Sequence, residues 1–279
     1  MRTIDTKIIT EKVSEIAIKA NYNLNSNIIE KFKKAKKEET SNQAKEILSQ
    51  LIENSQIAAQ EKIPICQDTG FGVVFLEIGN QVHIDGDIYE AVNEGIRQGY
   101  KKGYLRKSIV EDPLKRNNTG DNTPAVIHTK FVSGDKLKII FASKGGGSEN
   151  MSKIKMLKPT AGTEGIKTFV KNTIKEAGAN PCPPIFVGVG IGGTFEKVAY
   201  LAKKALIRDI NDSHPEKHIS KLENELLDEI NQLGIGPQGF GGKTTALTVK
   251  IEKFPCHIAS LPVAVNINCH AVRHKEIII

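Results

Sequence analysis

Residues 66–70 read Cys-Gln-Asp-Thr-Gly and place a thiol, an amide and a carboxylate on three consecutive side chains. A thiolate is a soft metal ligand and a carboxylate can transfer a proton, so this combination suits a metal-binding or catalytic turn. The apolar run 71–78 follows at once and predicts a strand, which would hold the turn on a rigid element, where catalytic loops are commonly found. We therefore expect a functional site at this turn.

The other cysteines are scattered along the chain, at positions 182, 256 and 269. Cys182 stands among prolines in residues 181–184, and Cys269 precedes a histidine in the segment Asn-Ile-Asn-Cys-His. The N-terminus has no signal-peptide pattern, so we expect a cytoplasmic protein whose thiols stay reduced. The spacing supports neither a zinc ribbon nor a thiol nucleophile. Metal ligation and a buried structural role both remain open for each cysteine.

Composition excludes several classes of function. The chain has 279 residues, of which 39% are hydrophobic, and this is enough for a substantial core. No apolar run of about 18 residues occurs, so no membrane span is expected. The net charge is +7, but most lysines lie in segments of mixed sign and there is no tryptophan. Without aromatic stacking platforms beside the basic runs, nucleic-acid binding is not expected.

The hydrophobic periodicity predicts the elements that must position these residues. Residues 4–61 show helical spacing, interrupted by an asparagine-rich break at 21–27, and Pro64 should end this opening region. The elements expected after it are a strand at 71–78 in a hairpin with a short strand at 82–84, a helix at 87–102, strands at 125–131 and 136–143, a helix at 163–177, a strand at 185–189, helices at 194–210 and 215–233, and strands at 245–251 and 258–265.

This pattern predicts a mixed α/β (α+β) fold in which an N-terminal helical section precedes a mixed sheet with flanking helices. No repeat or long linker divides the sequence. We expect one domain over residues 1–279, with the helical section at 1–62 and the mixed α/β part at 63–279.

Two glycine-rich segments resemble nucleotide-binding motifs. Residues 188–193 satisfy G-x-G-x-x-G after a strand, but no second strand with an acidic residue at its end follows. This segment could bind an anion at a helix N-terminus or only pack a strand against a helix. Residues 236–244 end in Gly-Lys-Thr, yet Pro237 stands where a P-loop needs glycine. Lys243 could meet an anionic ligand or lie exposed in a loop.

Taken together, the motifs resemble the iron-sulfur (class I) fumarate hydratases and the related L-tartrate dehydratases. The similarity runs in order from about residue 60 to the C-terminus and corresponds to the α subunit, the N-terminal, cluster-binding part of the single-chain enzymes. The blocks that carry it are residues 65–70, 116–125, 144–148, 182–193 and 239–243.

The resemblance implies a [4Fe-4S] cluster held by Cys66, Cys182 and Cys269, with one iron left open as a Lewis acid. Cys256 is left out of this set, because relatives often carry another residue there. The resemblance also implies a β subunit that completes the active site, in an α2β2 assembly.

The family's site residues carry over to five positions around a small dicarboxylate. Arg106 can bind a carboxylate through two hydrogen bonds, and Gln67 and His257 can donate hydrogen bonds. Gly147 lies in the glycine-rich block, and Asp68 is the candidate for proton transfer, with His257 as the second catalytic residue.

Plainer roles remain possible for these polar residues. Arg106 could be a surface arginine and Asp68 could only cap its turn. Asn118, Thr119 and Asp121 could orient the site or form a polar turn.

The expected activity is the reversible hydration of fumarate to (S)-malate by an α subunit. L-tartrate dehydratase, which forms oxaloacetate, is the alternative on the same apparatus. A dinucleotide-binding protein or a non-catalytic iron-sulfur subunit would be an alternative of another class.

Overall fold

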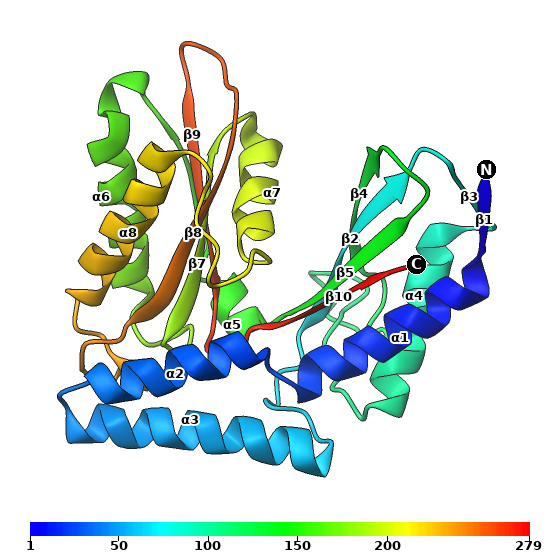
Figure 1. The fold of residues 1–279 in the computed structure, drawn as a ribbon, viewed down its shortest axis with the longest axis horizontal. Coiled ribbons are helices and arrows are strands. Elements are labelled where there is room, and N and C mark those ends of the chain that lie inside the picture. The colour runs from blue at the N-terminus through cyan, green and yellow to red at the C-terminus, as the bar shows by residue number, and fades with distance from the viewer. The chain divides into compact units, whose positions relative to one another are not determined.

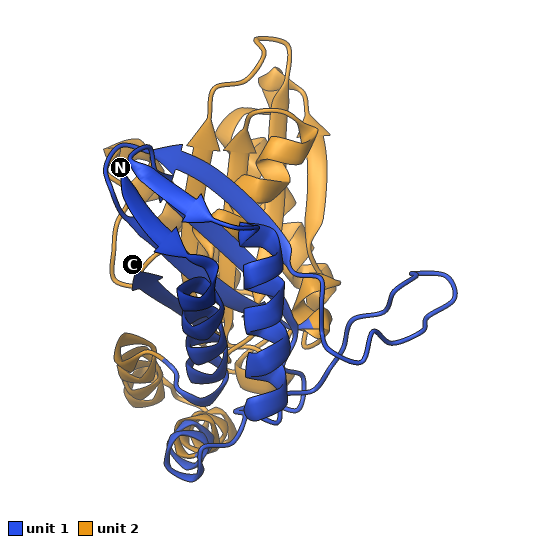
Figure 2. Ribbon diagram, turned by 90° about the vertical axis from the view of Figure 1, so that its right-hand side faces the viewer, with its two compact units in different colours: residues 1–24, 54–145, 273–279 blue, residues 25–53, 146–272 orange.

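The computed structural model describes residues 1–279 and divides them into two compact units. Unit 1 comprises residues 1–24, 54–145 and 273–279, and unit 2 comprises residues 25–53 and 146–272 (Figure 2). Each unit combines helices with its own four-stranded sheet, which confirms the predicted mixed α/β class. The helical section 1–62 is shared between the units, and the expected single domain stays a prediction. None of the helices is both long and apolar enough to cross a membrane.

Unit 1 is built on a mixed sheet with the strand order β10-β5-β2-β4. Its elements are β1 (Arg2–Asp5), α1 (Thr6–Tyr22), β2 (Phe71–Gly79), β3 (Val82–Asp85), α4 (Ile88–Lys102), β4 (Val126–Val132), β5 (Leu137–Lys144) and β10 (Arg273–Ile278). The end of α3 (Asn42–Glu61) also belongs to this unit.

Helices α1 and α4 pack against each other and against this sheet (Figure 1). The apolar residues of α4 recur at helical spacing, so its buried stripe faces the core. Asp87 caps α4 by accepting hydrogen bonds from the backbone amides of Tyr89 and Glu90. The buried core therefore fixes β2, and with it the turn that precedes Phe71.

Unit 2 is built on a second mixed sheet with the strand order β6-β9-β7-β8. Its elements are α2 (Ser26–Glu38), most of α3, α5 (Gly146–Glu149), β6 (Lys153–Leu157), α6 (Gly162–Ala177), β7 (Ile185–Gly192), α7 (Phe195–Ala205), α8 (Lys217–Asn231), β8 (Ala246–Phe254) and β9 (Leu261–Asn268), with short 3-10 turns at Pro159–Ala161 and Pro237–Gly239. Helices α6 and α8 cover one face of the sheet and α7 covers the other (Figure 1).

The opening region and the strand pairing differ from the sequence predictions. The break between the first two helices is confirmed, but the chain begins with a strand, β1, rather than a helix. The predicted hairpin is wrong, because β3 pairs in parallel with β1 while β2 lies between β4 and β5. Strands β6 and β10 were not expected at all. Edge strands of four to six residues carry too little hydrophobic alternation to be recognised from their own sequence.

The G-x-G-x-x-G segment packs a strand against a helix. Gly188 and Gly190 lie inside β7, and a Cβ added at either would come within 2.2 Å of a backbone carbonyl of α7. Only glycine therefore lets α7 approach this strand so closely. Of the two alternatives left open by the sequence, the structure favours packing over anion binding.

The backbone amides of the segment that resembles a P-loop are held by a carboxylate of this chain. Glu39 is buried and accepts hydrogen bonds from the backbone amides of Thr40, Ser41 and Lys243 at 2.8, 3.2 and 2.8 Å. Burial alone would raise the pKa of the Glu39 carboxyl, but these hydrogen bonds lower it below its usual value. The Glu39 carboxylate thus accepts the Lys243 amide that a bound anionic ligand would otherwise accept, and it holds the loop 236–244 in place.

Candidate functional site

In unit 1 the turn of residues 66–70 lies directly before β2 and is closed by its own residues. Asp68 Oδ1 accepts a hydrogen bond from the Gly70 amide at 2.9 Å. Gly70 has φ +63°, and a Cβ there would lie 2.5 Å from the Lys144 carbonyl carbon, so the turn requires glycine. The turn is thus fixed at its end while Gln67 remains exposed and Cys66 and Asp68 partly exposed.

Buried side chains hold the carbonyl groups of this turn in place. Tyr100 on α4 donates to the Thr69 carbonyl at 2.8 Å and lies 3.2 Å from the Gly70 carbonyl. Ser143 on β5 also donates to Thr69, and Arg273 at the start of β10 donates to the Asp68 carbonyl. The carbonyls of Asp68, Thr69 and Gly70 are thus bonded to buried donors, and this makes the end of the turn rigid, which suits a group that must bind or react in one geometry.

Asn122 and Arg106 join the same network from the polar loop that follows α4. The side-chain amide of Asn122 donates to the Gly70 carbonyl at 3.2 Å, and its oxygen accepts from the Ser108 amide at 2.7 Å. The Thr69 hydroxyl donates to the Arg106 carbonyl at 2.9 Å. The structure therefore brings Arg106, whose side chain is exposed, to the turn that carries Asp68.

We expect Tyr100→Phe to destabilise the chain by about 0.5–1.5 kcal/mol, because the buried carbonyls of Thr69 and Gly70 each lose one donor and keep Ser143 and Asn122, respectively. Burial raises the pKa of Tyr100 to about 12. The unfolded phenol ionises near pH 10 and the folded one only near pH 12, so wild-type stability falls across this range by up to roughly 3 kcal/mol. The wild type and Tyr100→Phe should therefore differ less in their free energy of unfolding by urea above pH 10 than below it.

Tyr104→Phe is the matched control for this measurement, because the Tyr104 side chain is 89% exposed. We expect it to unfold like the wild type at every pH. An unfolding difference between Tyr100→Phe and the wild type that stays constant from pH 8 to pH 12 would contradict the assignment of the raised pKa.

Asp121 supports the loop rather than a substrate. Its carboxylate accepts from Arg97 Nε at 2.9 Å and from the Thr123 amide and hydroxyl. Burial would raise the pKa of Asp121, but the hydrogen bonds from Arg97 and Thr123 lower it to about 2. Asn118 likewise bonds to the Lys107 carbonyl within the loop. Of the two roles that the sequence left open, a polar turn is the one that these contacts support.

In unit 2 the sheet brings the segments of Cys182 and Cys269 together. Cys182 lies just before β7 and Cys269 just after β9, and these strands are antiparallel neighbours in which Phe186 pairs with Asn268. The His270 amide donates to the Cys182 carbonyl at 3.3 Å. Two cysteines that are 87 positions apart in the sequence thus stand on adjoining loops at one end of the sheet.

Gly147 lies near these loops and His257 does not. A Cβ added at Gly147 would lie 3.6 Å from the Asn180 carbonyl oxygen, two residues before Cys182. His257 is exposed in the turn between β8 and β9, at the opposite end of the sheet from Cys269 (Figure 1). Strand β9, which lies between the two, is roughly 24 Å long from Leu261 to Asn268, at 3.4 Å for each of its seven steps. The catalytic role of His257 stays a prediction.

The cysteines have the accessibility and chemistry of metal ligands. None forms a disulfide; Cys182 and Cys256 are exposed, and Cys66 and Cys269 are partly exposed. Cysteine is otherwise among the most frequently buried residues. Within either unit no three histidine, cysteine, aspartate or glutamate side chains gather into a metal-binding group. The proposed ligand set is divided, with Cys66 in unit 1 and the other two cysteines in unit 2, and accessible thiols fit an iron-sulfur cluster.

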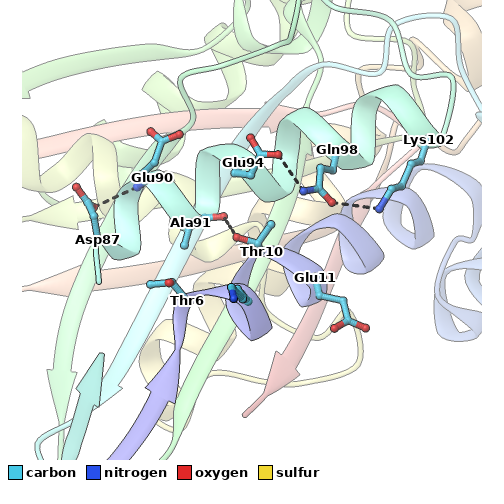
Figure 3. A pocket seen from close by; sticks show the side chains of 10 residues that line it. Thr6, Thr10, Glu11, Asp87, Glu90, Ala91, Glu94, Gln98 and Lys102 are labelled. Atoms are coloured by element: carbon cyan, nitrogen blue, oxygen red, sulfur yellow. Dashed lines mark hydrogen bonds between the residues drawn. The ribbon is translucent and has the colours of Figure 1, made fainter. Parts of the chain in front are cut away.

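Unit 1 has a groove at a different place. It has a volume of about 520 Å³ and lies between α1 and α4, lined by residues such as Thr10, Glu94 and Gln98 (Figure 3). Its side chains largely bond to one another, as Gln98 does to Glu94 and Lys102. It contains none of the predicted site residues.

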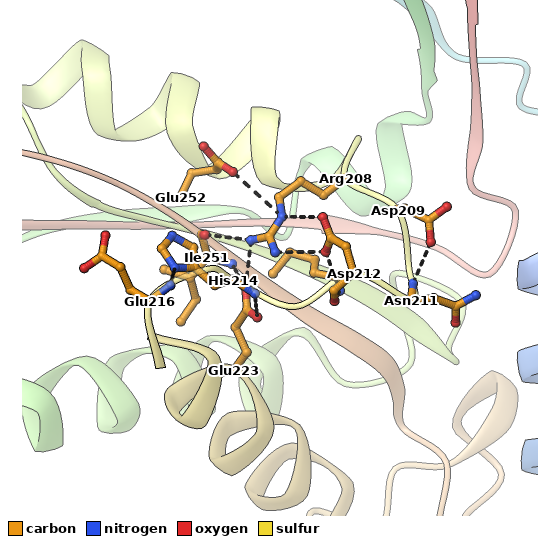
Figure 4. Close-up of polar contacts among 10 residues, drawn as sticks. Arg208, Asp209, Asn211, Asp212, His214, Glu216, Glu223, Ile251 and Glu252 are labelled. Atoms are coloured by element: carbon orange, nitrogen blue, oxygen red, sulfur yellow. Dashed lines mark hydrogen bonds and ion pairs between the residues drawn. The ribbon is translucent and has the colours of Figure 1, made fainter. Parts of the chain in front are cut away.

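Two acidic residues follow the G-x-G-x-x-G helix, and both are engaged within this chain: Asp209 accepts hydrogen bonds from the Asn27 side chain and the Asn211 amide, and Asp212 forms ion pairs. Asp212 pairs with Arg208 at 2.8 Å and with Lys250 at 2.9 Å, and Arg208 also bonds to buried Glu223 and the Ile251 carbonyl (Figure 4). These contacts tie the segment between α7 and α8 to β8. They occupy the Asp212 carboxylate with cations of this chain, and this argues against a ribose-binding role for Asp212 in the dinucleotide alternative.

Several residues of these networks escaped the sequence predictions. Tyr100, Ser143 and Arg273 lie far from the turn in sequence, and nothing in their own surroundings marks them. Asn122 lies inside the block 116–125, and His270 follows Cys269 directly, so each had a local signal.

Comparisons with known proteins agree with the motifs. The family model described as Fumarate hydratase (Fumerase) matches residues 10–278. A Methanocaldococcus jannaschii protein named "Putative L(+)-tartrate dehydratase subunit alpha" is 45% identical over 271 residues, which cover 95% of both chains. The L(+)-tartrate dehydratase subunit alpha of Escherichia coli (strain K12) is 32% identical over 274 residues, covering 97% of this chain and 90% of its own length.

The match covers nearly the whole chain and contains every block that carries the resemblance. The rigid turn at Cys66 and the adjoining loops of Cys182 and Cys269 lie within it. The chain therefore belongs to the fumarate hydratase (Fumerase) family of hydro-lyases.

Proposed function

We propose that this chain is the α subunit of a [4Fe-4S]-dependent hydro-lyase that interconverts fumarate and (S)-malate. The observation that carries the proposal is the pairing of the Cys182 and Cys269 loops at one end of a sheet, together with the rigid Cys66 turn. Cys66, Cys182 and Cys269 are the proposed ligands of the cluster. The reducing cytoplasm keeps the thiols available.

When bound, the cluster supplies an open iron that acts as a Lewis acid on the substrate's hydroxyl and carboxylate. The residues of the chain bind and orient the dicarboxylate. Arg106 pairs with a carboxylate through its guanidinium, and Gln67 donates a hydrogen bond from the exposed part of the turn. Asp68 moves the proton that is exchanged during addition or removal of water, and the backbone at Gly147 leaves room for substrate to approach.

A second subunit completes this site in the proposed enzyme. The relatives are named as alpha subunits, which supports a β partner, and we propose that the two subunits form an α2β2 assembly. Without its partner, the isolated chain is expected to take up a cluster and to turn over substrate slowly. Full activity of the isolated chain would contradict the need for a partner.

L(+)-tartrate is a second candidate substrate, because the relatives are named for it. Tartrate differs from malate by one additional hydroxyl group. A site built to hydrogen-bond that hydroxyl would have a kcat/KM for malate about 10⁴-fold lower than for tartrate. A site built for malate would offer no hydrogen-bond partner to the additional hydroxyl of tartrate. Comparison of kcat/KM for the two substrates therefore separates the candidates.

The test is an anaerobic assay of the reconstituted chain with the product of its neighbouring gene. We expect fumarate and (S)-malate to be interconverted with a higher kcat/KM than that for L-tartrate. The reverse ratio would replace the proposed substrate by tartrate. Failure to act on either substrate, with the cluster present, would overturn the proposed function.

A further inference from the structure

His270 and Gln238 connect the two cysteine loops of unit 2. His270 Nδ1 lies 3.1 Å from the Cys182 carbonyl oxygen, in addition to the hydrogen bond from the His270 amide to that oxygen. Gln238 Nε2 lies 3.2 Å from the same Nδ1 and donates to the Pro183 carbonyl at 2.7 Å. The backbone N–H of Gln238 also donates to the Pro183 carbonyl, at 2.8 Å. The carbonyls of Cys182 and Pro183 are thus both held from outside their loop.

The two prolines of this loop can be held by their neighbours only through their carbonyl groups. Pro183 and Pro184 have no backbone N–H, so this stretch offers carbonyl groups but no donors to its neighbours. Cys182 has φ +54° and Gln238 has φ +51°, a left-handed conformation that costs non-glycine residues free energy. Such conformations persist where the surroundings over-determine them, and they cluster at functional sites.

The loop that carries Gln238 is itself held at its other end. Glu39 accepts the Lys243 amide at 2.8 Å, and the Gly236 amide donates to the Thr245 hydroxyl at 3.2 Å. Gln238 is therefore presented from a restrained loop. This restraint allows a single side chain to fix the position of the Cys182 loop relative to His270, which follows Cys269 directly.

We propose that Gln238 and His270 are positioning residues that hold the thiols of Cys182 and Cys269 at the separation needed by a shared metal centre. The proposal rests on the metal-ligand role given to these cysteines in the proposed function. Neither residue is assigned contact with the substrate. Their contribution is measured as the metal affinity of the thiol pair, because partners that orient metal ligands typically change affinity by about 10–100-fold.

The test uses the full-length chain carrying Cys66→Ser and Cys256→Ser, which leaves only the two thiols of unit 2. Reduced chain is titrated anaerobically with Cd²⁺, a soft cation that thiolates bind, and followed by sulfur-to-cadmium charge-transfer absorption. Gln238→Asn keeps a residue that tolerates the left-handed conformation but is too short to reach Pro183. We expect Gln238→Asn and His270→Ala each to weaken Cd²⁺ binding by about 10–100-fold.

The double substitution should weaken binding by less than the product of the single effects, because both residues act through one set of contacts. Gln232→Asn and His218→Ala, at exposed positions, are the matched controls and should bind Cd²⁺ like the parent chain. If His270→Ala does not fold, Gln238→Asn decides alone.

Equal Cd²⁺ affinity in the parent chain and in Gln238→Asn, or no Cd²⁺ binding by the parent chain, overturns the proposal. Cd²⁺ binding requires neither cluster assembly nor turnover. A wild-type protein that lacks hydro-lyase activity while the variants lose Cd²⁺ affinity would therefore refute the proposed function and leave the positioning role standing.

Discussion

Cys66→Ser is expected to lose the visible absorption of the iron-sulfur cluster after anaerobic reconstitution and to lower hydro-lyase activity by about 10³-fold. A metal Lewis acid contributes several kcal/mol to stabilising the transition state, and each 1.4 kcal/mol is about tenfold in rate. Serine has nearly the shape of cysteine but lacks the thiolate that retains iron. Iron content, absorption and kcat/KM of the reconstituted protein with its partner measure the effect.

Cys256→Ser is the matched control for this substitution. Cys256 is exposed in the turn between β8 and β9 and lies outside the proposed ligand set. We expect the control to keep the iron content, absorption and activity of the wild type. Retention of a stable cluster by Cys66→Ser, or an equal loss in Cys256→Ser, would contradict the ligand assignment.

Asp68→Asn is expected to lower kcat by about 10²–10⁴-fold, which is the usual contribution of a positioned acid or base. The asparagine oxygen can still accept the hydrogen bond from the Gly70 amide that Asp68 Oδ1 accepts at 2.9 Å. The turn should therefore keep its geometry and the urea midpoint should stay near that of the wild type. Steady-state kinetics and urea unfolding of the same preparation separate the two roles.

Asp112→Asn provides a comparison with similar local chemistry. Asp112 Oδ1 accepts from the backbone amides of Leu114 and Lys115, each at 2.7 Å, in an exposed loop. We expect this variant to retain full activity. Unchanged kcat in Asp68→Asn would show that Asp68 only caps its turn, which is the plainer role that the sequence leaves open.

The sequence by itself determined most of the elements and the residues able to do chemistry. Long helices such as α4 and buried strands such as β2 show a clear hydrophobic pattern, so the sequence predicted their type and their bounds to within one residue. The turn at Cys66 was evident because a thiol, an amide and a carboxylate stand side by side. The family followed from motifs whose order along the chain is as specific as their composition.

Only the tertiary structure decided which distant residues support the site. The parallel pairing of β1 with β3 and the placement of β10 beside β5 depend on long-range contacts that no local pattern encodes. Tyr100 and Arg273 reach the Cys66 turn only because α4 and β10 pack around β2 and β5.

Long-range contacts also decide the pairing of Cys182 with Cys269 and the role of the glycines in residues 188–193. Antiparallel pairing of β7 with β9 brings the Cys182 and Cys269 loops together, and the length of β9 separates His257 from them. Gly188 and Gly190 fit a nucleotide motif and a packing contact equally well in sequence. Their neighbours in space, the backbone carbonyls of α7, decide for packing, because only three-dimensional proximity shows what a side chain there would meet.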